Sequence, residues 1–354
     1  MVTRRTFITG TALGSLSFLA RPVGAPAFAG ESVAAPALGG RQAGRAAYTF
    51  TQFHNQPATS SLHRRLVEMW AAIGTETNGR VHTQVFPQNN NIPGSDPAAL
   101  DMLVAGEIEF FTLMGGIIGN VVPVAEVQSI PFAFRSAAHA HRAMDGPLGA
   151  YLREEMAAKG IVGFPVGAFD NGMRQIAGTK RRIVVPDDLI GIRMRVPAAQ
   201  IFSDTFRALG AEPVTINSAD ILDAVRADRI DAQENPLALM DFFGIYDLVK
   251  YVSLSNHMWS GFNMLANQSA WTRLPDDIRT VIERNVTTSV RLQRADQNAT
   301  NMRLRAELPG RGLIVDEIDP APFRRQLSGV YAAWKQKLGS RCWSLLEAES
   351  GVLA

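Results

Sequence analysis

The sequence contains a single cysteine, only six histidines, and a low charged fraction of 19%. One thiol cannot build a disulfide framework, and so few histidines do not fit a zinc ribbon or finger. The 35 basic side chains are balanced by 33 acidic ones, which leaves no dense basic face for nucleic acid. We therefore expect no metal, no cofactor and no nucleic-acid partner.

Apolar residues make up 46% of the 354 residues, enough for about two domains with cores of their own. The first 29 residues are different in kind, because they combine the pair Arg4-Arg5, an apolar stretch from Phe7 to Ala20, and an A-x-A cleavage site at Ala27–Ala29. The paired arginines before Phe7 resemble a twin-arginine (Tat) export signal. An ordinary Sec signal or an uncleaved anchor is the alternative.

Removal of residues 1–29 takes away three arginines and no acid, so the remaining chain has 32 basic and 33 acidic side chains and a formal charge of −1. Residues 30–46 are rich in Ala, Gly and Pro and predict a flexible lead-in. No other apolar run approaches the roughly 18 residues that a membrane-spanning helix needs. We expect the mature protein to be exported to the periplasm.

Strand and helix patterns alternate along the mature chain, which is typical of an α/β protein with largely parallel sheets. One example is the stripe Leu62, Leu66, Met69 and Ile73, whose spacing predicts a helix after the capping Ser60. The predicted strands are 48–53, 81–86, 108–113, 161–166, 192–196, 213–216 and 230–233. The predicted helices are 61–78, 96–105, 198–209, 218–227 and 275–308.

The mature chain lacks the common hydrolase, nucleotide-binding and zinc-protease motifs. His139 and His141 are two residues apart on a predicted helix and so cannot share one face. Cys342 has no histidine nearby and predicts an inert packing residue. We expect no catalytic residues and no enzyme.

Arginines in apolar settings are the strongest binding candidates. Strand alternation places Arg193 and Arg195 on the same face of strand 192–196, near the carboxyl end where open α/β sheets bind ligands. Arginine suits planar, bidentate recognition of a carboxylate. The alternation cannot separate these two residues, and an edge strand with solvated arginines explains it equally well. Arg174 has the same ambiguity, and Asn235 could equally cap a helix or bind a ligand.

Several long motifs occur in series from about Tyr48 to the C-terminus. In the order and spacing of these motifs, the chain closely resembles the DctP-type solute-binding proteins of TRAP (tripartite ATP-independent periplasmic) transporters. The motifs are Asn171–Arg174, Val185–Pro197, Ala208–Pro213, Ile230–Pro236, Lys250–His257 and Trp271 with Leu274–Asp277.

The resemblance implies a two-lobed periplasmic binding protein with a long helix across both lobes. Lobe I would be 47–171 with 261–300, and lobe II would be 172–260 with 301–354. By this likeness Arg195 pairs with the ligand carboxylate, and Arg174 and Asn235 also contribute to binding.

The same resemblance places other residues at the pocket. Phe169, Asp170, Trp259 and Phe262 would line it, and Gln56, Asp96 and Met114 would face the arginines from the other lobe. This lining suits a hydroxy, sugar or aromatic monocarboxylate and does not choose among them.

The function that the resemblance implies is capture of a small organic acid for the small and large TRAP membrane subunits by a monomeric protein. A periplasmic sensor that feeds a receptor kinase, or an exported enzyme on the same scaffold, remains an alternative.

Overall fold

The computed structural model describes residues 46–353. Within these residues, ten strands form a mixed sheet in the order β2-β1-β3-β9-β4-β7-β5-β6, and β8 pairs with both β4 and β10. The strands are β1 (Tyr48–His54), β2 (Val81–Phe86), β3 (Phe110–Met114), β4 (Ile161–Gly178), β5 (Arg193–Val196), β6 (Glu212–Thr215), β7 (Ala232–Pro236), β8 (Tyr251–Leu254), β9 (Trp259–Asn267) and β10 (Ile314–Glu317).

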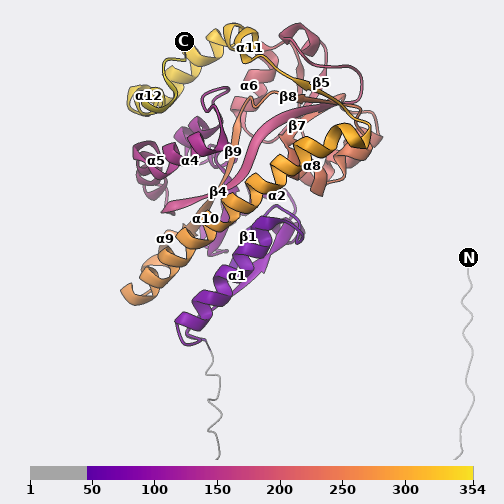
Figure 1. The fold of residues 1–354 in the computed structure, drawn as a ribbon. Helices are drawn as coiled ribbons and strands as arrows, with labels where there is room; N and C mark the ends of the chain where they lie inside the picture. The colour runs from indigo at the N-terminus through magenta and orange to yellow at the C-terminus, as the bar shows by residue number, and fades with distance from the viewer. Residues whose placement is uncertain (1–45, 354) are drawn as a thin grey trace, which may run out of the picture. The chain divides into compact units, whose positions relative to one another are not determined.

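Helices surround this sheet (Figure 1). In the described part of the chain the α-helices are α1 (Ser61–Glu76), α2 (Ser95–Ala105), α3 (Gly115–Ile118), α4 (Ala137–Asp145), α5 (Pro147–Ala157), α6 (Gln200–Ala208), α7 (Ile221–Arg226), α8 (Leu237–Phe242), α9 (Gln268–Thr272), α10 (Asp276–Glu307), α11 (Pro320–Gln326) and α12 (Ser328–Ser350). The 3₁₀ turns are η1 (Pro87–Asn91), η2 (Pro123–Ser129), η3 (Pro186–Leu189), η4 (Ser218–Asp220), η5 (Ile245–Asp247) and η6 (Leu308–Arg311). No helix within residues 46–353 is both long and apolar enough to cross a membrane.

The sheet consists of two half-sheets that share β4. The first half-sheet contains β1, β2, β3 and β9, and β9 pairs with residues 161–173 of β4. The second half-sheet contains β5, β6, β7, β8 and β10, and joins β4 through residues 174–178. Five of these nine pairings are parallel, and the four antiparallel ones all involve β4 or β9. The predicted α/β fold with mixed, largely parallel sheets is confirmed.

The predicted strand 161–166 is only the first third of β4. Gly163, Pro165 and Gly167 interrupt the apolar alternation, which is why the sequence suggested an early end. The structure absorbs these residues as a register shift between Gly163 and Ala168 and continues the strand. β4 thereby reaches both half-sheets.

The predicted long helix is α10, whose 32 residues follow Pro275 and begin with the acidic pair Asp276 and Asp277. One part lies beside α1, where Arg65 pairs with Asp296 at 2.8 Å. Farther along, Asn301 Oδ1 accepts a hydrogen bond from the first-turn amide of α8 at 3.1 Å. The helix therefore contacts both half-sheets (Figure 1).

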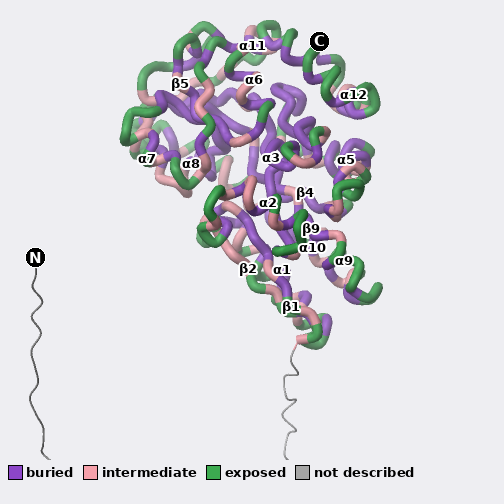
Figure 2. The backbone as a smooth tube through the Cα atoms, turned by 180° about the vertical axis from the view of Figure 1, so that it is seen from behind, coloured by how far each residue is buried: buried purple, intermediate pink, exposed green. Residues whose placement is uncertain are grey.

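Burial is concentrated in the central strands, while outer helix faces and turns are exposed (Figure 2). A large hydrophobic cluster runs from α1 and β3 through β9 to α6 and α12, and a smaller one lies between α7, α8 and β8. Helix α12 contacts η2, α4 and α5 as well as α6. The lobe boundaries proposed from the sequence stay a prediction.

Candidate functional site

Arg195 lies on β5, paired with Val214 of β6 and Gln233 of β7, close to the carboxyl end of the second half-sheet. Its side chain is 2% exposed, and Nε donates to the carbonyl of Ile216 at 2.8 Å. That is its only hydrogen bond within residues 46–353, although a guanidinium has five N–H donors. The terminal nitrogens of Arg195 therefore have no acceptor within residues 46–353 and are donors available to a ligand at the carboxyl end of β5.

Burial lowers the pKa of Arg195 to about 10, and the carboxylate of Glu234 acts against that shift. The group still carries its positive charge at neutral pH. A buried, charged and under-bonded guanidinium favours an anion with two oxygens.

Arg193 shares the face of Arg195 but is paired within the protein. Its guanidinium bonds both oxygens of Asp231, at 2.7 and 3.0 Å, and also contacts Asp228. The structure thus separates the two arginines that strand alternation could not. Arg193 fastens the start of β5, and Arg195 stays available near its end.

Arg174 is also committed to internal contacts. It forms a bidentate ion pair with Glu234, which is completely buried, and donates to Ser260 Oγ at 3.1 Å and Asn235 Oδ1 at 3.0 Å. Its guanidinium also lies over the ring of Phe202. Burial opposes ionisation of Glu234, but Arg174 and a hydrogen bond from His257 outweigh it and hold its pKa below the usual range.

Asn235 lies within β7 and does not cap α8, because Asn301 supplies the bond to the Ala238 amide. Its amide orientation follows from Arg174, which can only donate and so must face Oδ1. Asn235 Nδ2 then donates to Gln233 Oε1 at 2.6 Å. This leaves Gln233 Nε2 as a buried donor without a partner in residues 46–353.

Acceptors approach from the first half-sheet. Asp96 of α2 is 6% exposed, and its two oxygens accept from Asn55 Nδ2 at 2.7 Å and Asn89 Nδ2 at 2.6 Å. Burial raises the pKa of Asp96, while Asn55, Asn89 and the positive charge of Arg195 act to lower it. Asp96 and Arg195 thus act on each other electrostatically, each raising the stability of the other's charged form.

Two more acceptors are buried on this side. Asn89 Oδ1 and Gln56 Oε1 have no hydrogen-bond partner within residues 46–353. Gln56 Nε2 donates to Asn171 Oδ1 of β4 at 3.0 Å, which ties the end of β1 to the strand that both half-sheets share.

A pocket of about 270 Å³ lies between these elements. One wall comes from the end of β1, η1 and the start of α2, and the other from η4 and the end of α8. Its lining residues are Asn55, Gln88, Asn91, Ile92, Gly94, Ser95, Asn217, Ser218, Ala219, Asp220 and Phe243. One of them, Asn55, donates to Asp96, so the pocket lies beside this buried carboxylate, and the negative charge of Asp220 acts to raise the pKa of Arg195.

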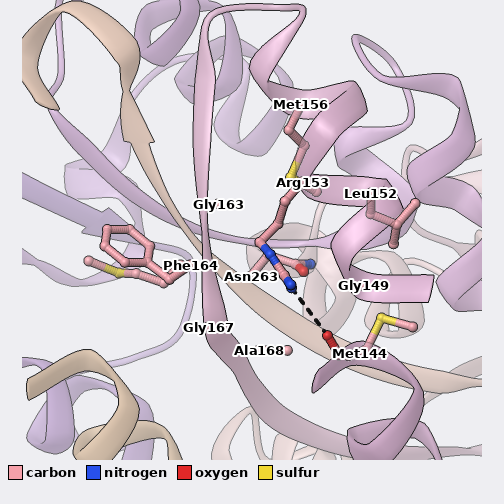
Figure 3. A pocket seen from close by; sticks show the side chains of 11 residues that line it. Met144, Gly149, Leu152, Arg153, Met156, Gly163, Phe164, Gly167, Ala168 and Asn263 are labelled. Atoms are coloured by element: carbon pink, nitrogen blue, oxygen red, sulfur yellow. Dashed lines mark hydrogen bonds between the residues drawn. The ribbon is translucent and has the colours of Figure 1, made fainter. Parts of the chain in front are cut away.

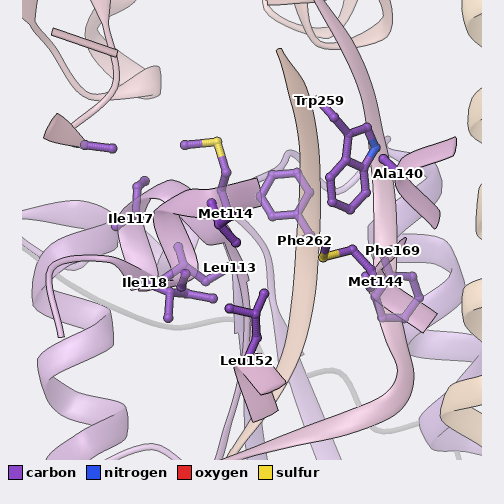
Figure 4. Packing of buried hydrophobic residues seen from close by; sticks show 14 of the residues in the cluster. Leu113, Met114, Ile117, Ile118, Ala140, Met144, Leu152, Phe169, Trp259 and Phe262 are labelled. Atoms are coloured by element: carbon purple, nitrogen blue, oxygen red, sulfur yellow. The ribbon is translucent and has the colours of Figure 1, made fainter. Parts of the chain in front are cut away.

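Four residues expected at the pocket by resemblance have other surroundings. Phe169, Trp259 and Phe262 lie in the large hydrophobic cluster together with Met114 (Figure 4). Met114 also contacts Arg174 through its sulfur at 3.7 Å.

Asp170 lines a different pocket, of about 290 Å³, against α10 and the start of α4. Its Oδ1 accepts from Trp259 Nε1 and the Gly172 amide, both at 2.9 Å. Asp170 thus orders the bulge in β4. A ligand role for Asp170 or Trp259 stays a prediction.

A third pocket, beside Arg153, is only about 20 Å³ and too small for an organic acid (Figure 3). Its arginine donates to the carbonyl of Met144 at 3.4 Å. In residues 46–353, no three His, Cys, Asp or Glu side chains are grouped to hold a metal ion.

Ser255, His257 and Glu234 form the arrangement closest to a catalytic series. Ser255 Oγ contacts His257 Nδ1 at 2.7 Å, and His257 Nε2 contacts Glu234 at 3.2 Å. Because Glu234 already neutralises Arg174, its carboxylate is held by a permanent ion pair. We interpret the series as part of the buried polar core.

The sequence had not singled out Gln233, Glu234, Asn89 or Asp220. Gln233 and Glu234 belong to the quoted Ile230–Pro236 motif, which was the available signal for them. Asn89 and Asp220 lie in irregular turns, where no periodicity could show their direction.

Two half-sheets that share one strand and one long helix, with a buried arginine at the carboxyl end of one of them, are typical of a solute-binding protein of the periplasmic type. The sequence model of bacterial extracellular solute-binding protein, family 7 (DctP) matches residues 53–337. The chain belongs to this family, whose members are solute-binding proteins rather than enzymes.

The chain is also similar to individual proteins and solved structures. An uncharacterised protein of Sinorhizobium fredii, y4mM, is 32% identical over 237 residues, 67% of this chain and 43% of that protein. The C4-dicarboxylate-binding periplasmic protein DctP of Rhodobacter capsulatus is 29% identical over 59% of this chain and 61% of its own length. The crystal structure of a TRAP periplasmic solute-binding protein of Roseobacter denitrificans with bound β-D-glucuronate has a TM-score of 0.81 and 26% identity, covering 86% of this chain and 99% of that one.

Proposed function

We infer that the chain is the extracytoplasmic solute-binding subunit of a TRAP transporter and that it captures a small organic acid by pairing its carboxylate with Arg195. The single observation that carries this proposal is the state of Arg195, which is buried and charged and has one protein acceptor within residues 46–353. An acid in the adjoining pocket would satisfy the remaining donors. Family membership and the acids bound by its relatives support the same reading.

In this function Arg174 and Asn235 act mainly by positioning. The ion pair of Arg174 with Glu234 fixes Asn235, and Asn235 fixes the free donor of Gln233. The loaded protein would deliver its ligand to the small and large membrane subunits. It would work as a monomer after export by the twin-arginine signal, which lies outside the described residues.

A thermal-shift screen against organic acids tests the proposal directly. A ligand that binds only the folded state at 100 times its Kd stabilises it by about 2.7 kcal/mol, which a melting curve resolves. Hits are then measured by calorimetry with the wild type and with Arg195→Ala. The proposal fails if no acid stabilises the protein, or if Arg195→Ala binds the hits as tightly as the wild type.

A further inference from the structure

The helices that follow β3 and β5 approach each other closely and bring the two half-sheets into contact. Gly116 lies in α3, which follows β3 of the first half-sheet, whereas α6 follows β5 of the second. A Cβ at Gly116 would lie 3.1 Å from Phe202 Cε2 and 3.2 Å from Ala199 Cβ, so α3 packs against the start of α6 as closely as a glycine allows (Figure 2). Asn120 Nδ2 adds a hydrogen bond to the carbonyl of Ala198 at 3.2 Å. This contact joins the half-sheets in addition to β4 and α10, which run through both.

Glu126 of η2 makes the charged part of the contact. It is 3% exposed, and its Oε2 accepts a hydrogen bond from the backbone N–H of Ile201, in the first turn of α6, at 2.8 Å. Its Oε1 pairs with Lys337 of α12 at 3.1 Å. Two residues further along the same turn, Gln128 Oε1 accepts from Asn263 Nδ2 of β9 at 3.1 Å. Gln128 therefore anchors η2 to the first half-sheet, while Glu126 holds the start of α6.

The polar groups at this contact differ from those of a permanent core. Burial raises the pKa of Glu126, and the carboxylate of Asp204 acts in the same direction, although the two partners of Glu126 oppose the shift. Ser129 Oγ and Gln128 Nε2 are buried beside the glycines of α3 and have no hydrogen-bond partner within residues 46–353. If the contact opens, water can solvate the carboxylate and bond both of these groups. The closed contact thus gains the bonds of Glu126 and loses hydration, which is the balance expected of a contact that forms and breaks.

We propose that the contact of Glu126 with α6 is a latch that opens and closes with the two half-sheets, and that Glu126 determines how much of the ligand-free protein is closed. The inference rests on the proposed function, since a protein that exchanges a buried acid must open. It goes further because it names the contact that breaks. α6 begins at Gln200, five residues after Arg195, so Glu126 is a positioning residue that acts on the helix directly after the anchoring strand.

A reversible cross-link tests the latch without any acid. The Cβ spacing at Gly116 and Ala199 approaches the roughly 3.5–4.5 Å of a disulfide, so the double variant Gly116→Cys with Ala199→Cys should form a bond across the latch. Cys342 is completely buried and should not compete. By small-angle scattering, the oxidised protein should have a smaller radius of gyration than the reduced one, because only the oxidised form is held closed. Equal radii of the two forms would overturn the inference.

The rate of cross-linking measures the role of Glu126 itself. At a fixed concentration of diamide, adding Glu126→Ala to the cysteine pair should slow bond formation by about threefold or more, because the closed arrangement loses a charge-assisted bond and an ion pair. Glu126→Gln keeps an acceptor for the Ile201 N–H and should restore part of the rate. Glu154→Ala is the matched control, since Glu154 forms an exposed ion pair with Arg341 of α12 at 2.9 Å, and it should leave the rate unchanged. An unchanged rate in Glu126→Ala would show that Glu126 is not the latch.

Hydrogen exchange on the wild type covers the case in which the cysteine pair distorts α3. The Ala270 amide of α9 is the matched reference, because it is also a buried first-turn N–H and bonds a local acceptor, Asn267 Oδ1, at 3.0 Å. In the ligand-free protein, NMR should show the Ile201 amide exchanging about tenfold faster or more, since opening removes its acceptor. Equal exchange of the two amides would overturn the inference.

The proposed function and the latch fail in different ways. A protein whose latch opens but which no acid stabilises would refute the proposed function alone. A protein that binds acids while its Ile201 amide stays as protected as that of Ala270 would refute the latch alone.

Discussion

Arg193 and Arg195 are two residues apart on one strand, and their different neighbours give them different tasks. Asp231 and Asp228 neutralise Arg193, whose side chain is partly exposed, so that its contribution is a surface ion-pair cluster. Arg195 is buried, and its terminal nitrogens have no acceptor within residues 46–353. The two arginines are distinguished by whether the guanidinium is already paired with a carboxylate, and not by their position in the strand pattern.

Replacing Arg195 with alanine should weaken binding of an acid found by screening by about 100-fold or more, close to 3 kcal/mol. A charge-assisted bidentate bond in a buried site is lost, and the ligand carboxylate is left unpaired. Arg195→Lys should also bind at least tenfold more weakly, because one ammonium cannot reproduce the planar fork. Isothermal titration calorimetry measures both.

Arg193→Ala is the control for this experiment. It removes an arginine of the same strand face without touching the pocket, and binding should change less than threefold. Equal losses in Arg193→Ala and Arg195→Ala would contradict the assignment of the anchor.

The buried residue His54 should make the folding stability depend on pH. Burial lowers its pKa to about 3, and the nearby ring of His63 adds to the effect. The folded chain therefore keeps His54 neutral, while the unfolded chain binds a proton near its ordinary pKa of 6.5. Stability from this residue is present above pH 6.5 and is lost as the pH falls toward 3.

The expected loss from His54 between pH 7 and pH 5 is about 2 kcal/mol of unfolding free energy. In the wild type the backbone N–H of Gln56 donates to His54 Nδ1 at 3.2 Å, and His54→Asn retains an acceptor for this bond. The variant should reduce the dependence of the unfolding free energy on pH in this range. Urea denaturation at both pH values measures it. His82→Asn, at an exposed histidine, should leave the slope unchanged, and an equally steep slope in His54→Asn would refute the assignment.

The sequence could predict which residues lie at the site better than whether their side chains are free to bind a ligand or are paired within the protein. Motif resemblance led to Arg195, and the structure shows why it is suited to an anion. The sequence could not reveal that Arg174 forms an ion pair with Glu234, because the two residues are 60 positions apart and meet only through the pairing of β4 with β7. It also could not place Asp170 against Trp259, because the bulge in β4 changes the side-chain direction there.

At the scale of elements, the ion pair of Arg174 and Glu234 fastens the second part of β4 to β7. Both side chains are at most 2% exposed. Breaking a buried pair by removing one partner costs about 3–5 kcal/mol, because the other charge stays buried without compensation. Arg174→Met should therefore lower the unfolding free energy by that order in denaturant titrations, and any weakening of ligand binding should be smaller than that caused by Arg195→Ala.

The double variant Arg174→Met with Glu234→Met separates charge from packing. Its loss should be clearly smaller than the sum of the two single losses, since no unpaired charge remains. Additive losses would refute the ion pair as the main interaction. A stable Arg174→Met protein that loses binding 100-fold would instead make Arg174 a direct ligand residue.

Element prediction from sequence succeeded where periodicity was long and failed where glycines interrupted it. Helices α1 and α10 have clear apolar stripes and N-terminal signals, and both lie where the pattern predicted. β4 contains Gly163, Gly167 and Gly172, and its continuity depends on pairing with β9, which the local pattern did not identify. Long-range strand pairing, not local propensity, holds this strand together.

At the scale of the whole molecule, delivery to the periplasm precedes binding. If Arg4 and Arg5 form a twin-arginine signal, replacing both with lysine should leave precursor in the cytoplasm, because that export route reads the paired arginines. Immunoblots of cytoplasmic and periplasmic fractions measure the distribution. An unchanged periplasmic yield would exclude the Tat route and leave Sec export in its place.

We predict that ligand exchange requires the two half-sheets to separate. Arg195 and Asp96 belong to different half-sheets, act on each other electrostatically, and are both almost completely buried. An acid therefore cannot reach or leave Arg195 while the side chains remain in this arrangement. The elements that connect both halves, β4 and α10, are the segments about which such a movement can occur.

Small-angle scattering tests this closure on the intact mature protein. Saturation with an acid found by screening should reduce the radius of gyration, because contacts with both half-sheets favour the closed arrangement. Arg195→Ala, at the same acid concentration, should keep the larger radius, since the ligand no longer binds. A membrane subunit can distinguish loaded from empty protein only if the two differ in this way. An unchanged radius at full saturation, verified by calorimetry on the same sample, would refute closure and favour a rigid sensor.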